Sequence, residues 1–410
     1  MKKLYRLPIL LALLSASCEH KTEMVSLGLE DTYVLPRMKA VRLFPAFTGT
    51  GYQWTMRLDD GRDSLLSTER EYIFISADPG NFHLTFEILD PDNPIIHEME
   101  MIVQEEQVEY SAYISKVYEY RPAPGQFIND LPTYEEGDTA ETMRAKAEEC
   151  ISGTNNQLIS LGSYGGYVTF GFDHTVMNID GERDFVIYGN SFYSNGTSSD
   201  DLYGSCEPGI VQVAFDWNQN GRPDDDEWYE LAGSEYYKPE TVKGYEIVYS
   251  RPDPDKAPVP DPDFVPYVDI TYIPWRDNRQ QTGYVYKNKT HTQSYYPLWL
   301  TDDELRFSGT LLAPNGEDVY GDKSEFRQRP CDWGYVDNHP NEAVDVDGNL
   351  LSSFDIGWAV DKEGNPVKLP GADFIRVYTG ILQYCGNMGE TSTELSKALD
   401  LHIDTDPVLP

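Results

Sequence analysis

The 410-residue sequence is poor in basic residues, histidine and cysteine, and it lacks long apolar runs. It has 32 Lys and Arg against 69 Asp and Glu, which gives a formal net charge of −37 at pH 7. Because a polyanion would be repelled, this charge argues against nucleic acid as a partner and suits neutral or cationic ligands and calcium. No run after Leu14 approaches the roughly 20 residues that a membrane-spanning helix needs.

Motifs of the common enzyme classes are also missing. The sequence has no G-x-S-x-G, no H-E-x-x-H and no glycine loop of the phosphate-binding kind, and its seven His are scattered. Among so many acidic residues, sequence alone does not nominate a catalytic carboxylate pair. The sequence therefore predicts a protein that is not an enzyme.

The sequence contains five cysteines, four in the body of the chain and Cys18 in its first residues. Cys150, Cys206, Cys331 and Cys385 are spaced too widely for a zinc site. In an oxidising compartment they could form two disulfides, one or none, and the sequence leaves all three possibilities open.

Cys18 ends an export signal, MKKLYRLPILLALLSASC. Basic residues precede an apolar run, Leu7 to Leu14, that is too short to span a bilayer, and small residues then lead to the cysteine. This pattern resembles a bacterial lipoprotein signal, although Ser15 stands where such signals usually have Leu. An ordinary secretory signal is the alternative. We predict that residues 1–17 are removed and that acylated Cys18 anchors the protein in the outer membrane, facing outward, through a tether over residues 18–31.

Strand patterns dominate the remainder of the chain. Residues 32–110 contain short alternating runs, such as NFHLTFEI, separated by Asp-Gly and Pro-Gly turns, and they predict an Ig-like sandwich. Residues 111–140, rich in Pro and Gly, are expected to form a linker. Good helix formers in AETMRAKAEECI predict a short helix over Ala140–Ile151. Tyr- and Trp-rich strands then fill a C-terminal domain, residues 141–405, of the jelly-roll or sandwich type. The predicted fold class is all-β.

One acidic stretch, FDWNQNGRPDDDEWYEL, has the spacing of an EF-hand-type calcium loop. Such a loop needs oxygen donors at positions 1, 3, 5, 7, 9 and 12 and a glycine at position 6, here Gly221. The donors are Asp216, Asn218, Asn220, Arg222 through its carbonyl, Asp224 and Glu227. The alternative is a solvated Asn-Gly turn. We predict a structural Ca²⁺ site between two strands.

Several strings resemble known surface proteins. YQW at residues 52–54 and NFHL at residues 81–84 resemble PKD-like domains. PAPGQFIN, LGSYGGYVTFGFD, DFVIYGNSF, EPGIVQVAFDWNQNG, HTQSYYPLW, WGYVDN, FDIGWAVD and GETSTEL resemble Bacteroidetes surface lipoproteins, among them the cobalamin-binding accessory lipoproteins of TonB-dependent uptake loci. The resemblance implies cobalamin (vitamin B12) as the ligand and a TonB-dependent outer-membrane transporter as the partner. A glycan-binding surface lipoprotein and a structural or adhesive surface protein are the alternatives.

Aromatic and amide side chains in the C-terminal half are candidate ligand contacts. A corrinoid needs flat aromatic surfaces and amide or hydroxyl partners, and a sugar needs much the same. The candidates are Trp275, Asn278, His291, Gln293, Tyr295, Tyr296, Trp299, Trp333, Tyr335 and Asn338, with Asp277 beside them. The alternative for each aromatic residue is a place in the core.

Overall fold

The computed structural model describes residues 27–403 except 91–93, 106–108 and 197–200. It divides into two compact units. Unit 1 comprises Val41–Phe74, Gly80–Val103 and the described residues up to Leu35, and unit 2 comprises Pro36–Ala40, Ile75–Pro79 and the described residues from Gln104 on. Strands far outweigh helices, which confirms the all-β fold class. Among the described residues, no helix has the length and apolar character to cross a membrane. The predicted lipidation site, Cys18, lies outside the described residues.

Unit 1 contains two sheets. A five-stranded sheet has the order β1-β7-β6-β3-β4, and β2 pairs with β5. The strands are β1 (Thr32–Pro36), β2 (Val41–Leu43), β3 (Tyr52–Arg57), β4 (Asp63–Ser67), β5 (Tyr72–Phe74), β6 (Gly80–Ile88) and β7 (Ile95–Gln104). Trp54 and Phe86 are completely buried, with ring centroids 4.5 Å apart, and they form the centre of this core. The alternating pattern of β6 places Leu84, Phe86 and Ile88 on the buried face.

Unit 2 contains the remaining elements. They are β8 (Lys116–Arg121), α1 (Ala140–Ile151), β9 (Ile159–Ser160), β10 (Tyr167–Gly171), β11 (Val176–Met177), β12 (Phe185–Tyr188), β13 (Phe192–Tyr193), β14 (Gly204–Ser205), β15 (Gly209–Ala214), β16 (Trp228–Leu231), β17 (Val242–Ser250), β18 (Tyr267–Asp277), β19 (Thr282–Asn288), β20 (Glu304–Leu311), β21 (Gly316–Asp318), β22 (Phe326–Gln328), β23 (Ser353–Phe354), η1 (Ile356–Trp358), β24 (Ala359–Val360), β25 (Gly371–Ala372), β26 (Phe374–Thr379), η2 (Gly386–Met388), β27 (Glu394–Leu395) and β28 (Lys397–Asp400).

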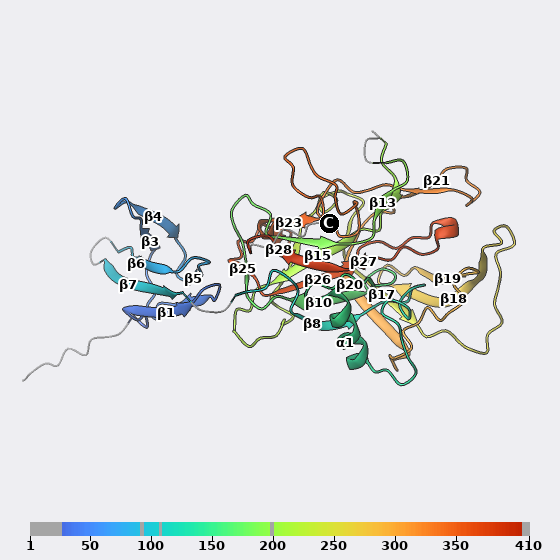
Figure 1. Cartoon of the computed structure of the whole chain (residues 1–410), viewed down its shortest axis with the longest axis horizontal. Helices are drawn as coiled ribbons and strands as arrows, with labels where there is room; N and C mark the ends of the chain where they lie inside the picture. Colours follow the sequence, from blue (N-terminus) through green and yellow to red (C-terminus); the bar gives the residue numbers. More distant parts are fainter. Residues whose placement is uncertain (1–26, 91–93, 106–108, 197–200, 404–410) are drawn as a thin grey trace, which may run out of the picture. The chain divides into compact units, whose positions relative to one another are not determined.

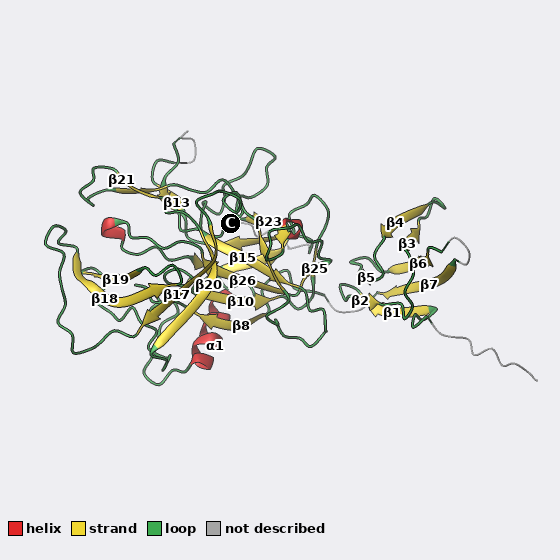
Figure 2. Ribbon diagram, turned by 180° about the vertical axis from the view of Figure 1, so that it is seen from behind, coloured by secondary structure: helices red, strands yellow, loops and turns green. Residues whose placement is uncertain are grey.

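A six-stranded sheet, β24-β16-β15-β26-β10-β8, forms the centre of unit 2 (Figure 1). A second, four-stranded sheet, β19-β18-β17-β20, packs against it through one continuous hydrophobic core (Figure 2). Smaller sheets, β23-β12-β28 and β13-β14-β22-β21, and the pairs β11-β25 and β27-β9 complete the unit. Helix α1 has the predicted bounds, and the Thr139 hydroxyl caps it by accepting from the backbone N–H of Thr142 at 3.2 Å.

The segment 111–140, expected as a linker, belongs to the core of unit 2. Strand β8 pairs with β10 as the edge of the central sheet, and the string PAPGQFIN that follows is largely buried. The backbone N–H groups of Ala123 and Gly125 donate to the carbonyls of Leu161 and Tyr295, at 3.0 and 2.8 Å. A Cβ at Gly125 would lie 2.7 Å from Cα of Gly162, so glycine is needed here because the chain passes close to neighbouring backbone.

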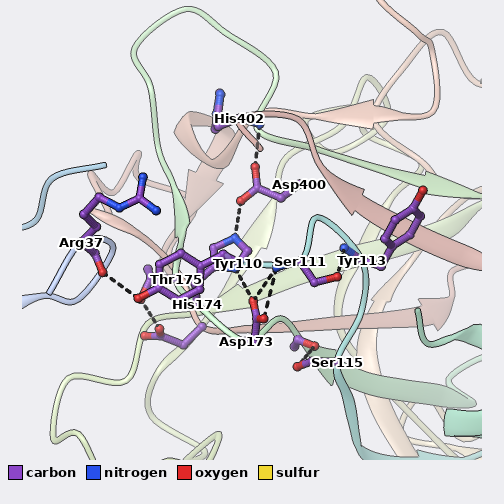
Figure 3. Close-up of polar contacts among 12 residues, drawn as sticks. Arg37, Tyr110, Ser111, Tyr113, Ser115, Asp173, His174, Thr175, Asp400 and His402 are labelled. Carbon is purple, nitrogen blue, oxygen red and sulfur yellow. Dashed lines mark hydrogen bonds and ion pairs between the residues drawn. The ribbon is translucent and has the colours of Figure 1, made fainter. Parts of the chain in front are cut away.

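A histidine-centred network within unit 2 joins β28 and the residues just after it to the segment between β10 and β11 (Figure 3). The His174 ring is buried, and its Nδ1 and Nε2 lie 2.7 Å from carboxylate oxygens of Asp173 and Asp400. The His402 ring nitrogen Nε2 lies 2.8 Å from Asp184. Burial alone would lower the pKa values of both histidines, but their carboxylate partners outweigh it and raise them.

Candidate functional site

A pocket with a volume of about 420 Å³ opens on the four-stranded sheet β19-β18-β17-β20. We call it the aromatic pocket. Its walls come from β17, β18, β19 and β20, and from the segments that follow β20 and β26. Its aromatic lining residues are Tyr245, Trp275, Tyr284, Tyr286 and Tyr384; its polar ones are Arg279, Gln281 and Thr282; its apolar ones are Leu311, Leu312, Pro314 and Leu382, with Gly283 between.

The aromatic rings are held in place by packing between strands. Trp275 of β18 is the register partner of Gly283 in β19, so its indole faces a residue without a side chain. Tyr286 and Tyr384 stack with centroids 4.6 Å apart and planes 24° apart, and the Tyr384 hydroxyl accepts from the Tyr286 backbone N–H at 3.2 Å. Tyr284 is 39% exposed at the mouth. The wall is therefore pre-formed, with one ring left open to solvent.

The indole N–H of Trp275, which lines the pocket, is buried and has no hydrogen-bond partner within the described part of the chain. Asp277, two residues further on, is not a lining residue of the pocket. One oxygen of Asp277 accepts from the backbone N–H groups of Arg279 and Gln281, at 2.9 and 2.7 Å, which fixes the β18–β19 turn. Burial raises the pKa of Tyr245, and the charge of Asp277 and a side-chain hydrogen bond to it raise it further. The pocket thus combines an aromatic wall with one unused donor.

Of the ten predicted contact residues, only Trp275 lines this pocket. Asn278 lies next to it on the exposed turn, where its amide donates to the Gly244 carbonyl at 2.8 Å. Tyr295 and Tyr296 are almost fully buried, and their hydroxyls donate to the carbonyls of His291 and Asp302, at 3.2 and 2.7 Å.

Five further predicted contacts pack in the core or hydrogen-bond to neighbouring loops. His291 packs edge-on against Phe127, and Gln293 donates to Asp130 at 2.9 Å. Trp299 is buried and stacks with Tyr120 at 6.1 Å. The Tyr335 hydroxyl accepts from the backbone of Glu235 at 3.1 Å, and the Asn338 amide pairs with both backbone groups of Cys331 at 2.8 Å. These side chains are occupied in positioning loops and filling the core.

Trp333, the remaining candidate, lies in a separate and smaller pocket of about 290 Å³ with Arg183, Asp332, Asp345, Leu351 and Trp358. The rings of Trp333 and Trp358 are 4.7 Å apart. The Arg183 guanidinium lies 4.4 Å from the Trp358 ring and 3.5 Å from Asp345. The charged and aromatic side chains that line this pocket are thus engaged with one another.

The calcium-type loop joins β15 to β16 and has the internal hydrogen bonds of a tight turn. Asp216 accepts from the backbone N–H groups of Asn220 and Gly221, at 3.0 and 2.7 Å, and Gly221 adopts a φ of 72°. Glu227 is buried and accepts from the backbone of Trp217 and Asp224, at 3.0 and 3.2 Å. The side-chain amides of Asn218 and Asn220 donate to Asp224 at 2.8 and 2.7 Å. The side chains of the loop are thus hydrogen-bonded to one another and to its backbone, their carboxylate oxygens do not all lie within 4.8 Å of one another, and calcium binding here stays a prediction.

The four body cysteines carry free thiols in this structure. Cys150, Cys206 and Cys385 are buried, and burial raises the pKa of Cys206 and that of Cys385 to about 12. Reactive thiols usually have lowered pKa values, so these thiols are packing residues.

Sequence reasoning missed most of the aromatic pocket. Tyr284 and Tyr286 stand two residues apart in TGYVYKN, a spacing that places both on one face of a strand. That alternation was a usable signal. Tyr245 and Tyr384 join them only through sheet pairing and loop packing, which residue type does not predict.

No family model and no curated protein matches the chain. Among solved structures, a quinoprotein alcohol dehydrogenase-like protein from Bacteroides thetaiotaomicron aligns over 22% of this chain and 21% of its own, at 13% identity and a TM-score of 0.16. A SusE-like protein aligns over 89% and 94%, at 10% identity and a TM-score of 0.29. A carbohydrate-binding module of the β-sandwich superfamily aligns over 88% and 90%, at 8% identity and a TM-score of 0.13. Likeness at this level carries no argument about fold or function.

Proposed function

We propose that this protein is a lipid-anchored surface protein that captures a small nutrient molecule in the aromatic pocket and breaks no bond in it. The observation that carries the proposal is a pre-formed aromatic wall that presents one buried and unused donor, the indole N–H of Trp275. An unpaired buried polar group costs free energy, so a ligand that accepts from this N–H gains affinity there.

A short glycan is the ligand that this geometry favours. The apolar face of a sugar ring stacks on aromatic side chains, and its hydroxyls both donate and accept hydrogen bonds. The volume of about 420 Å³ lies near the lower end of the roughly 300–1,000 Å³ that is usual for ligand sites. One or two sugar rings fit this space, with Arg279, Gln281 and Thr282 at the rim.

Cobalamin is the second candidate, because strings across residues 122–395 resemble cobalamin-binding accessory lipoproteins. A corrinoid carries amide oxygens that could accept from the Trp275 indole. It is much larger than the pocket, so only one edge of the macrocycle would enter, and Tyr284 would lie against the part outside. On this alternative, the protein would hand its ligand to a TonB-dependent transporter.

Titration calorimetry on the mature chain tests the proposal and separates the ligands. The chain is titrated with a panel of oligosaccharides and, separately, with cyanocobalamin. Tyr284→Ala removes the exposed ring of the pocket, and Tyr320→Ala is the matched control, because Tyr320 is 68% exposed and does not line the pocket.

Glycan binding that weakens in Tyr284→Ala and persists in Tyr320→Ala supports the proposal. Binding of cyanocobalamin with the same pattern, and no response to sugars, establishes the second candidate. No binding of either ligand, or equal binding by both variants, refutes the assignment of the pocket. Release of a reaction product during the titration would refute the absence of catalysis.

A further inference from the structure

Three carboxylates from distant parts of the chain meet inside unit 2. Each of Glu207, Asp337 and Glu394 offers one oxygen, and these oxygens all lie within 4.8 Å of one another. We call these three residues the carboxylate cluster. In the described part of the chain, it is the one group of three acidic, His or Cys side chains that comes so close. Asp337 and Glu394 are 2% and 3% exposed.

The backbone around the carboxylate cluster fixes its members in place. The Glu207 backbone N–H donates to the Asp337 carbonyl at 2.8 Å, and the Glu394 backbone N–H donates to the Asp337 carboxylate at 2.9 Å. Glu394 also accepts from the hydroxyls of Ser160 and Ser392, at 2.7 and 2.6 Å. These donors orient the carboxylates but bring no positive charge.

A fourth buried carboxyl group, that of Glu390, interacts electrostatically with Glu394. It is 4% exposed; one oxygen accepts from the Gln126 backbone at 2.6 Å. Burial raises the pKa of Glu390 to about 8, and burial likewise raises the pKa of Glu394 to about 7. The groups that oppose these shifts are backbone N–H groups, hydroxyls and the Asn190 amide, not basic side chains.

Buried oxygens in and against the segment that leads to Glu394 provide a second, independent observation. Three buried acceptor oxygens have no donor among the described residues: Oε1 of Gln126, Oε1 of Gln328 and Oε2 of Glu390. Both glutamines bracket the segment that carries Glu390 and Glu394, since their amides donate to the Met388 carbonyl at 2.8 Å and to the Thr391 hydroxyl at 3.1 Å. A surplus of acceptors over donors in a buried place is the environment that a cation satisfies.

We propose that the carboxylate cluster binds a divalent cation, and that the donor set selects calcium. All the available donors are oxygens, which calcium prefers, whereas zinc sites use sulfur and nitrogen. Magnesium keeps several waters in its shell, so a crowded and buried site suits the larger ion. This ion would be distinct from that of the calcium-type loop. It would join the segments before β15, after β22 and at β27, and so act as a cross-link inside unit 2.

The test is the number of calcium ions bound per chain. The full mature chain is stripped with EDTA, desalted and titrated with CaCl₂ alone, with elemental analysis of the gel-filtered protein. Asp216→Ala disables the calcium-type loop and leaves the carboxylate cluster intact, so it must still bind one equivalent. Adding Asp337→Asn or Glu394→Gln to it must remove that equivalent. Glu230→Gln, a neutralised carboxylate outside the cluster that bonds Thr310, must keep the wild-type count.

Two results would overturn the proposal. The first is an Asp216→Ala protein that binds no calcium, and this result does not depend on whether the cluster variants fold. The second is a folded Asp216→Ala, Asp337→Asn protein, judged by near-ultraviolet circular dichroism, that retains the equivalent. Either result would mean that protons alone neutralise these carboxylates.

Discussion

The indole of Trp275 lies against Gly283 so closely that a Cβ at position 283 would be 2.4 Å from Cζ2 of the ring. The two residues are register partners in adjacent strands. No unusual backbone angle requires this glycine. Glycine is needed at position 283 for a steric reason, because only a residue without a side chain leaves room for the Trp275 indole to form the wall of the aromatic pocket.

Gly283→Ala should therefore displace Trp275 and weaken ligand binding. Overpacking of this kind costs about 1–3 kcal/mol of stability, and a displaced ring should reduce affinity by roughly tenfold, which corresponds to 1.4 kcal/mol. Calorimetric titration and a melting curve measure both effects. Gly51→Ala is the control, since a Cβ there meets its nearest atom, Leu89 Cδ1, at an ordinary 3.5 Å. Unchanged binding in Gly283→Ala would remove Trp275 from the site.

Local patterns predicted local structure well. Helix formers after Thr139 predicted α1 with its observed bounds, and alternation predicted strands such as β6. The prediction for residues 111–140 differed, because Pro and Gly mark both free linkers and chain that is pressed against other backbone. A Cβ at Gly166 would lie 1.9 Å from the Leu161 carbonyl oxygen, a contact that no local pattern encodes.

The site was harder to predict than the fold. Residue type singled out Trp275, but it also singled out Tyr295 and Tyr296, whose rings fill the core. An aromatic side chain contributes as much to a core as to a binding wall, and only tertiary packing decides between the two. The carboxylate cluster of Glu207, Asp337 and Glu394 could not be predicted from the sequence either, since its members lie more than fifty residues apart and meet only in the fold.

Calcium should stabilise the protein through the predicted loop. A ligand that binds only the folded state contributes about 2.7 kcal/mol at a hundredfold excess over its dissociation constant. In the Glu394→Gln background, which leaves only the loop, calcium should raise the melting temperature, and adding Asp216→Ala should abolish that rise. A Glu394→Gln protein whose melting curve is the same in EDTA and in calcium would contradict the loop assignment. Asp226→Ala, an exposed acid outside the six donors, is the control.

Stability without metal should fall as pH rises. The pKa of Glu390 is raised from 4.5 to about 8 and that of Glu394 to about 7. The folded state therefore holds protons that the unfolded state releases, and the stability that these protonated groups give is complete below about pH 4.5 and is lost as pH rises through their folded-state pKa values. His174 and His402, whose pKa values are also raised, act in the same direction from about pH 6.5 upward. In EDTA, the free energy of unfolding should be lower at pH 8.5 than at pH 5 by several kcal/mol, since one pKa unit corresponds to about 1.4 kcal/mol. The melting temperature should fall accordingly.

Calcium should remove the carboxylate part of this loss, because a bound cation favours the ionised form of its ligands. The slope of melting temperature against pH should therefore be shallower in calcium than in EDTA, while the share due to His174 and His402 persists. The Asp216→Ala protein should show the same difference, since its carboxylate cluster is intact. If the slopes of melting temperature against pH coincide in EDTA and in calcium in that variant, calcium does not change the protonation of the buried carboxylates. The proposal that a calcium ion cross-links them is then wrong.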